Sequence, residues 1–210
     1  KEEVHILFGG STAERQVSLM SGTNVWLKLK KSKRYLPSPY LLDQNSCVWH
    51  LPYTYALNHT VEEIYENCLT AEAAVDRMEK FHNDIKKRLA FAPQNYRVRD
   101  QLPVRWTFQD FLEHSKKKDA FIFLALHGGE GENGALQDTL EKKGMLYNGS
   151  KPKASELCMD KYLTGQAIAS MGLAHILTVP KKPIKISSLN QLSQKELEQF
   201  WNSLQKELSS

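Results

Sequence analysis

The sequence predicts an α/β domain in three layers (α/β/α), with helices on both faces of a mainly parallel β-sheet. Two apolar runs, residues 4–8 and 120–126, carry this prediction. Neither run alternates with polar residues, which is typical of a strand covered on both faces in a parallel sheet. Each run stops at a Gly-Gly pair and is followed by a helical pattern. Because ligands of such sheets bind beyond the carboxyl ends of the strands, we expect a site for a small charged ligand beside these glycines.

Length and composition exclude several classes of protein. The 210 residues allow one large domain, or one domain and part of another, and the 41% of hydrophobic residues suffices for a core. The net charge of +4 is small, and without a basic and aromatic pattern we expect no nucleic-acid partner. No run approaches the ~20 apolar residues that span a bilayer, so we expect no membrane partner. Three scattered cysteines favour a cytoplasmic location and no structural metal site.

The N-terminal elements follow from local signals. Residues 13–30 predict a helix, with Ser11 or Thr12 as its cap and Glu14 in its first turn. Its inner side is expected to carry Val17, Met20, Val25 and Leu29. Residues 35–42 predict a second strand, which its two prolines push toward an edge of the sheet. Residues 43–55 predict a short hairpin or an irregular segment.

Residues 60–89 predict one long helix, opened by Thr60 and Glu63 as a capping box. Its apolar positions alternate spacings of three and four without a slip, and they are Val61, Ile64, Cys68, Ala71, Val75, Met78, His82, Ile85 and Leu89. One interpretation is a coiled-coil arm for dimerisation, and the other is an amphipathic helix on its own domain. The small residues in this seam favour the second interpretation, so we expect Val75, Met78 and Ile85 to be buried within the monomer.

The rest of the chain continues the alternation of helices and strands. A helix is predicted at residues 107–118, before the second apolar run, and another at 133–143 after it. The segments that follow are predicted in this order: a short strand at 145–147, a helix at 155–171 ended by Gly172, a strand at 175–179, a linker at 180–183 and a charged amphipathic helix at 192–208.

Three ordered motifs resemble bacterial D-alanine–D-alanine ligases, which are ATP-grasp enzymes. The first is residues 7–19, LFGGSTAERQVSL, and the second is residues 125–137, ALHGGEGENGALQ. The third combines residues 147–150, YNGS, with residues 159–164, MDKYLT. Ordered motifs at sensible spacing are more specific than one glycine pattern. The resemblance covers about residues 4–43 and 107–180, and residues 44–106 match nothing in it.

The resemblance implies a domain organisation. Residues 1–150 are expected to form the N-terminal ligase-like domain, of the pre-ATP-grasp, Rossmann-like type, with a helical insertion at about 58–92. Residues 151–210 are expected to be the start of the central ATP-grasp domain. Nothing after Lys161 resembles the family's phosphate-covering loop or its metal ligands. The second domain is therefore expected to be incomplete, and the chain to be inactive alone.

The resemblance also implies a reaction and a site. ATP phosphorylates the carboxylate of one D-alanine, magnesium (or manganese) ions neutralise the phosphates, and the amine of a second D-alanine attacks the acyl phosphate. Glu14 matches the catalytic family acid that holds the ammonium group of the first D-alanine. Ser18 matches a residue that borders this pocket, and His127 matches the histidine beside the substrate carboxylate. Lys161 matches a lysine that reaches ATP phosphate, and no metal ligand is expected within the chain.

Each of these residues also has a structural interpretation. Glu14 alone could be an ordinary acid near a helix start, and Ser18 could simply face the preceding turn. His127 alone could be a hydrogen-bonded core histidine, and Lys161 a surface lysine. Glu132 is expected to bind backbone amides of its own turn rather than substrate. The motif context favours the functional interpretation of Glu14, His127 and Lys161.

Two positions depart from the motif, and they leave the substrate class open. Asn133 stands where an Asp is usual, and Asp138 where a Gly is usual. Asn can still bridge a turn with its side chain, so we expect function to survive. The expected partners are D-alanine, ATP, the remainder of the ligase and a second subunit in a homodimer, and the expected role is peptidoglycan synthesis. The alternatives are another ATP-grasp ligase, such as one that forms a depsipeptide, and a non-catalytic dimerisation module.

Overall fold

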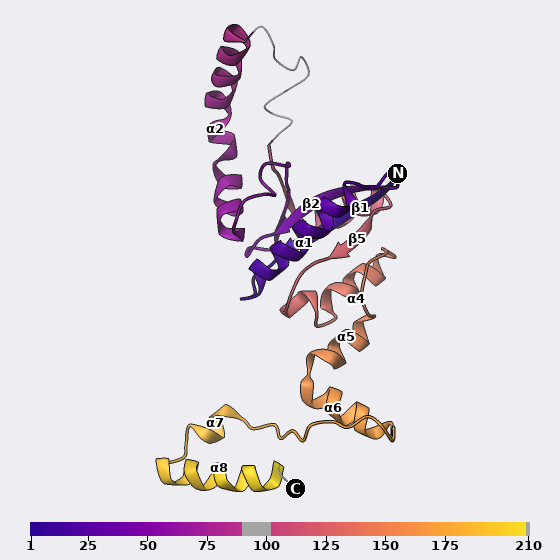
Figure 1. Ribbon diagram of the computed structural model, residues 1–210, viewed down its shortest axis with the longest axis vertical. Coiled ribbons are helices and arrows are strands. Elements are labelled where there is room, and N and C mark those ends of the chain that lie inside the picture. The colour runs from indigo at the N-terminus through magenta and orange to yellow at the C-terminus, as the bar shows by residue number, and fades with distance from the viewer. Residues whose placement is uncertain (90–101, 209–210) are drawn as a thin grey trace. The chain divides into compact units, whose positions relative to one another are not determined.

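The computed structural model of the chain describes residues 1–89 and 102–208 (Figure 1). The chain divides into two compact units, Lys1–Lys153 and Ala154–Ser210. Their boundary lies close to residue 150, where the sequence analysis divides the chain. That the second unit begins a central domain stays a prediction.

The first unit is built on a five-stranded sheet with the strand order β4-β3-β2-β1-β5. Its strands are β1 (Glu2–Gly9), β2 (Tyr35–Leu42), β3 (Cys47–His50), β4 (Val104–Thr107) and β5 (Phe121–Leu124). β1 pairs in parallel with β2 and with β5, whereas β3 pairs antiparallel with β2 and with β4. The α/β prediction is thus confirmed, with a parallel centre and an antiparallel side. Instead of the short strand predicted at 145–147, the structure has a single parallel bridge, Ile122 to Tyr147.

Helices cover both faces of this sheet. α1 (Arg15–Leu29) and the start of α2 (Val61–Arg88) lie on one face. There Ile6 and Phe8 pack with Leu19, Trp26 and Ile64. The other face carries α3 (Phe108–Lys117) and α4 (Ala135–Lys142), which pack on Leu7, Tyr40 and Ile122 through residues such as Phe111 and Leu140. The alternation of β1 side chains between two apolar clusters explains its unbroken apolar run.

The face of α1 that meets the sheet differs from the expected one. Val17 and Met20 are exposed, and the buried residues are Ser18, Leu19, Gly22 and Trp26. The helix turns this face inward because Gly22 lies directly on Phe8, where a Cβ atom would be only 2.7 Å from the Phe8 Cβ. The prediction for Val17 and Met20 was wrong, since hydrophobicity alone does not reveal a close helix-to-strand approach.

The strand with the two prolines is internal, contrary to expectation. β2 lies between β1 and β3. The β3 ladder covers only Tyr40–Leu42 of β2, and the Pro39 carbonyl accepts one further hydrogen bond from the Leu51 N–H on that side. Both prolines therefore lie outside the β3 ladder, a position that tolerates residues without an N–H group.

The long helix begins as predicted, but its seam is not buried throughout. The Thr60 side chain accepts a hydrogen bond from the Glu63 backbone N–H. Val75 is buried, Ile85 is half-buried, and Met78 is exposed at 36%. The prediction was thus correct for Val75 and wrong for Met78, because only the first half of α2 reaches the domain core. The end of the predicted insertion, residues 90–92, lies outside the described residues.

The second unit holds α5 (Pro152–Met159), which begins just before it, α6 (Lys161–Ser170), α7 (Ile186–Leu189) and α8 (Gln194–Leu208). The helix predicted at 155–171 is two helices, because Asp160 interrupts it and caps α6 through the backbone N–H groups of Tyr162 and Leu163. The strand predicted at 175–179 has no regular structure. Across residues 1–89 and 102–208, no helix has the length and apolar character needed to cross a bilayer.

A buried histidine makes the stability of the first unit dependent on pH. His5 lies among Tyr40, Phe111 and His114, and its Nδ1 is 2.7 Å from the Ser115 hydroxyl oxygen. Burial, helped by the charges of His114, His50 and Lys118, lowers the pKa of His5 to about 3. The unfolded chain binds a proton near pH 6.5 that the folded chain does not accept, so folding is destabilised progressively as the pH falls from 6.5 toward 3.

We therefore expect the free energy of unfolding, measured with urea between pH 7.5 and pH 4, to fall with pH. The slope should be smaller in His5→Asn than in the parent chain. His59→Asn is the matched control, since its side chain is 93% exposed. Equal slopes for all three proteins would contradict the assignment of this dependence to His5.

Candidate functional site

The two glycine pairs meet at the carboxyl edge of the sheet. The Gly10 backbone N–H donates to the Leu42 carbonyl, and Ala125 N–H donates to the Leu7 carbonyl, so the ends of β1, β2 and β5 lie together. Gly9 has a φ of +95°, and a Cβ atom there would be 2.5 Å from Leu41. The turn after β1 therefore requires glycine both for its conformation and for its close packing.

Between these loops lies a cavity of about 180 Å³. Its wall is formed mainly by backbone-rich segments, residues 9–12 after β1 and residues 126–131 after β5. The lining includes the acids Asp43 and Glu130, and no Lys or Arg is among the described residues of the lining. A cleft of this composition favours a ligand that carries a positive group.

Glu14 lies against the second glycine loop. It is exposed at the start of α1, and a Cβ atom on Gly128 would be 3.1 Å from Glu14 Oε2. Gly128 has a φ of +69°, so glycine at this position both permits the turn and leaves room for the carboxylate. Glu14 was expected in the first turn of α1, but it is the N-cap residue of this helix. Its N–H donates to Thr12 Oγ1 at 3.3 Å.

His127 is held by side chains from both loops. Its Nε2 is 3.1 Å from Ser21 Oγ of α1, and its Nδ1 is 3.8 Å from Glu132 Oε1. The Thr12 hydroxyl donates to the His127 carbonyl at 2.8 Å. The sequence analysis assigned Glu132 to its own turn, and the structure pairs it with the histidine ring. Glu14 and His127 thus lie on the same edge of the sheet, as expected if they share a ligand.

Ser18 lies beneath the first glycine turn. Its side chain is fully buried, and its hydroxyl accepts a hydrogen bond of 2.7 Å from the Gly9 backbone N–H. Since this N–H would otherwise be buried without a partner, Ser18 holds the turn that carries Glu14. Its direct contact with substrate stays a prediction.

Lys161 belongs to the second unit, where it is exposed as the first residue of α6. In the described ranges, no group of three or more His, Cys, Asp and Glu side chains could hold a metal ion. The proposed role of Lys161 rests on its motif.

Two positions that depart from the motif are accommodated. Asn133 Oδ1 accepts a hydrogen bond of 3.0 Å from the Ala135 N–H, as the sequence analysis expected for a bridged turn. Asp138 forms an ion pair with Lys142, one turn further along α4. Neither residue disrupts the loop that carries His127.

The sequence analysis did not predict the roles of three residues near the cleft. Thr12 bonds to the His127 carbonyl, Ser21 lies within hydrogen-bond distance of the His127 ring, and Asp43 closes a turn. Asp43 Oδ1 accepts hydrogen bonds from the N–H groups of Asn45 and Cys47, and Oδ2 accepts one from Trp49 Nε1. Its carboxylate thus closes the β2–β3 turn. An acid directly after an apolar strand was the available signal.

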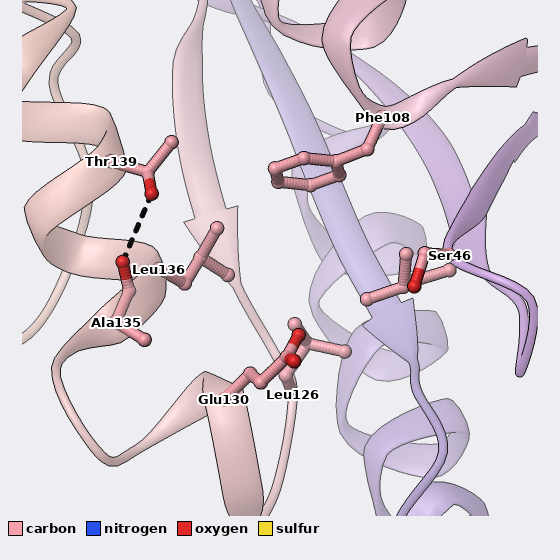
Figure 2. Close-up of a pocket in the computed structure, with 8 residues that line it drawn as sticks. Ser46, Phe108, Leu126, Glu130, Ala135, Leu136 and Thr139 are labelled. Carbon is pink, nitrogen blue, oxygen red and sulfur yellow. Dashed lines mark hydrogen bonds between the residues drawn. The ribbon is translucent and has the colours of Figure 1, made fainter.

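A second cavity of about 250 Å³ adjoins the cleft and shares Leu42, Ser46, Leu126 and Glu130 with it. Figure 2 shows Phe108 and Leu136 among the residues that line it, with the Thr139 hydroxyl bonded to the Ala135 carbonyl. Because this lining is largely apolar, the glycine-bounded cleft is the better candidate for a charged ligand.

The profile of the D-ala D-ala ligase N-terminus family matches residues 3–150. The chain belongs to this family. It is 30% identical over 176 residues to the D-alanine–D-alanine ligase of Chlorobaculum tepidum, covering 83% of this chain and 42% of that protein. It is 28% identical over 163 residues to the Pediococcus pentosaceus ligase, covering 77% of this chain and 41% of that protein. The chain therefore spans less than half the length of these relatives.

The fold is also similar to that of a solved family member. D-alanyl-alanine synthetase A of Vibrio cholerae superposes with a TM-score of 0.50 at 15% identity, covering 91% of this chain and 44% of that one. This likeness concerns the fold alone. It agrees with the α/β arrangement of the N-terminal unit.

Proposed function

We propose that this chain is the N-terminal part of a cytoplasmic D-alanine–D-alanine ligase and supplies half of the pocket for the first D-alanine. The observation that carries the proposal is the position of the Glu14 carboxylate against Gly128, the residue that follows His127. Among the described residues that line the adjoining cleft, His127 is the only basic one. A fixed carboxylate in such a cleft suits a compact ammonium group.

In the proposed reaction, ATP activates the carboxylate of the first D-alanine as an acyl phosphate. The amine of the second D-alanine then attacks the acyl carbon, and phosphate leaves as the peptide bond forms. Glu14 binds the ammonium group of the first D-alanine, and the ring of His127 lies beside its carboxylate. Fixing both ends of a small substrate orients the carboxylate for reaction. Ser18 supports this arrangement by holding the Gly9 turn.

Support for a nucleotide role is confined to Lys161, which matches the family lysine that reaches ATP phosphate. ATP and Mg²⁺ (or Mn²⁺) bind mainly through other parts of the ligase, since nothing after Lys161 resembles the family's phosphate-covering loop or its metal ligands. The proposed product, D-alanyl-D-alanine, serves peptidoglycan synthesis, and the proposed assembly is a homodimer.

The test is a ligase assay on the full-length protein that carries this chain. With D-alanine, ATP and Mg²⁺, we expect D-alanine-dependent phosphate release and D-alanyl-D-alanine in the mass spectrum. D-lactate offered beside D-alanine separates the dipeptide ligase from a depsipeptide-forming one. Absence of D-alanine-dependent phosphate release would overturn the proposal and favour a non-catalytic module.

The 210-residue chain itself provides a second measurement. We expect no ligase activity and at most weak binding of ATP and Mg²⁺ in a calorimeter, because nothing after Lys161 resembles the family's phosphate-covering loop or its metal ligands. Micromolar affinity would show that the nucleotide site lies within this chain.

A further inference from the structure

The first turn of α2 is bonded to the first turn of α1, next to Glu14. Glu62 Oε1 accepts a hydrogen bond of 2.5 Å from Arg15 Nε, and Glu62 Oε2 accepts one of 2.5 Å from Gln16 Nε2. The Val61 backbone N–H donates to Gln16 Oε1 at 3.2 Å. Both oxygens of one carboxylate are thus engaged by consecutive residues of α1.

These bonds continue to the candidate site. Arg15 Nη1 donates to the Thr12 carbonyl at 3.1 Å, while the Thr12 hydroxyl donates to the His127 carbonyl. The Glu14 N–H also donates to that hydroxyl. A continuous set of hydrogen bonds therefore joins α2 to both loops of the cleft, and such packed networks can couple distant positions.

The bond between Arg15 and Glu62 bears on the candidate site because Arg15 carries a positive charge next to Glu14 in the sequence. Arg15 follows Glu14 directly, and a guanidinium prefers a carboxylate partner when one is within reach. If its partner were Glu14, it would compete with the ammonium group of a substrate. In the structure the partner of Arg15 is Glu62, and the Glu14 carboxylate lies beside Gly128.

The environment of Glu62 agrees with a carboxylate that stays ionised. The pKa of Glu62 is lowered by its own backbone N–H and by the hydrogen bond from Arg15, with a smaller contribution from Gln16. The side chains of Arg15 and Glu62 are 28% and 44% exposed. Partly exposed ion pairs contribute little to stability, so the pair is better explained by the orientation of Arg15 than by folding energy.

We propose that Glu62 is a positioning residue of the first-substrate site, which holds the Arg15 guanidinium away from Glu14 and leaves Glu14 free for a primary ammonium group. The inserted helix α2 thereby takes part in substrate binding. This proposal rests on the proposed function for the identity of its ligand, a small α-amino acid.

The first test is kinetic and uses the full-length ligase. In Glu62→Gln we expect KM for the first D-alanine to rise about three- to thirtyfold, with a smaller change in kcat. Adding Arg15→Gln to this variant should bring KM back toward the parent value, because the competing cation is gone. Glu66→Gln, an exposed acid one turn further along α2, is the matched control and should leave KM unchanged.

Three outcomes overturn the proposal. The first is an unchanged KM in Glu62→Gln, and the second is a raised KM that Arg15→Gln does not restore. The third is a loss of thermal stability with kcat reduced at constant KM, which would show a merely structural role.

A measurement on the 210-residue chain separates this proposal from the proposed function. In ¹H–¹⁵N spectra, Glu62→Gln should shift the Gly128 amide signal, since the Glu14 carboxylate turns toward Arg15, whereas Glu66→Gln should not. If the full-length protein forms no D-alanyl-D-alanine but the Gly128 signal responds, the proposed function fails and the role of Glu62 stands. An unshifted Gly128 signal overturns the role of Glu62 whatever the enzyme does.

Discussion

We expect Glu14→Gln in the proposed full-length ligase to weaken binding of the first D-alanine by about 1.5–3 kcal/mol, the usual contribution of a hydrogen bond to a charged group. The substitution preserves the size of the side chain and its fit against Gly128, and it removes the charge that is proposed to pair with the substrate ammonium group. The effect should be in the apparent affinity for the first D-alanine, obtained from initial rates as D-alanine is titrated.

Glu130→Gln is the matched control for Glu14→Gln. Glu130 is an exposed acid that lines the cleft, and the motif assigns it no contact with substrate. We expect its variant to retain most of the affinity. An unchanged affinity in Glu14→Gln would reject the role of Glu14, and an equal loss in both variants would show that only the general negative potential of the cleft matters.

Gly22→Ala is the substitution with the largest expected effect on stability. In an exposed helix this change would stabilise by roughly 0.5–1 kcal/mol. Here the new methyl group would lie 2.7 Å from both Cβ and Cδ1 of Phe8. Overpacking of this kind costs about 1–3 kcal/mol, which corresponds to a fall in Tm of roughly 2–12 °C for a chain of this size.

Gly165→Ala provides the control for Gly22→Ala, because its added Cβ would meet only the flexible end of Lys181. We expect that variant to melt at or slightly above the parent temperature. The double variant Gly22→Ala/Phe8→Ala should be less destabilised than the sum of its single changes, since Ala at residue 8 lacks the Cγ and Cδ1 atoms that the new methyl group would meet. Strict additivity would show that the helix does not press on residue 8.

The sequence predicted those elements whose signals are local. The strand at Tyr35–Leu42 and the cap of α2 at Thr60 are where the local patterns place them. The inward face of α1 could not be predicted, because it is set by the contact of Gly22 with Phe8 rather than by hydrophobicity. β4 was missed because the alternation of apolar and polar residues in Val104–Thr107 covers only four residues, too few to distinguish a strand from a loop.

In the candidate site, too, residues with a local sequence signal were predicted, and residues whose role depends on distant contacts were missed. Glu14 and His127 were found because each belongs to a motif next to a glycine pair. Thr12 and Ser21 were not assigned their contacts, since a hydroxyl carries no signal of a partner more than 100 residues away in the sequence. Glu62 was read only as part of a long helix, because its partners in α1 become neighbours only in the folded chain.

The hydrogen bond between Thr12 and the His127 carbonyl spans 115 residues, and it has a consequence for the folding kinetics of the chain. β1 can pair with β2 after a short loop closure, whereas its pairing with β5 encloses most of the first unit. Contacts of high sequence separation form late, because the entropy of closing the long loop must be overcome first. The cleft therefore cannot exist in a partly folded chain whose β5 is undocked. We expect a ligand of this cleft to slow unfolding while leaving the refolding rate unchanged, since it binds only the completed sheet.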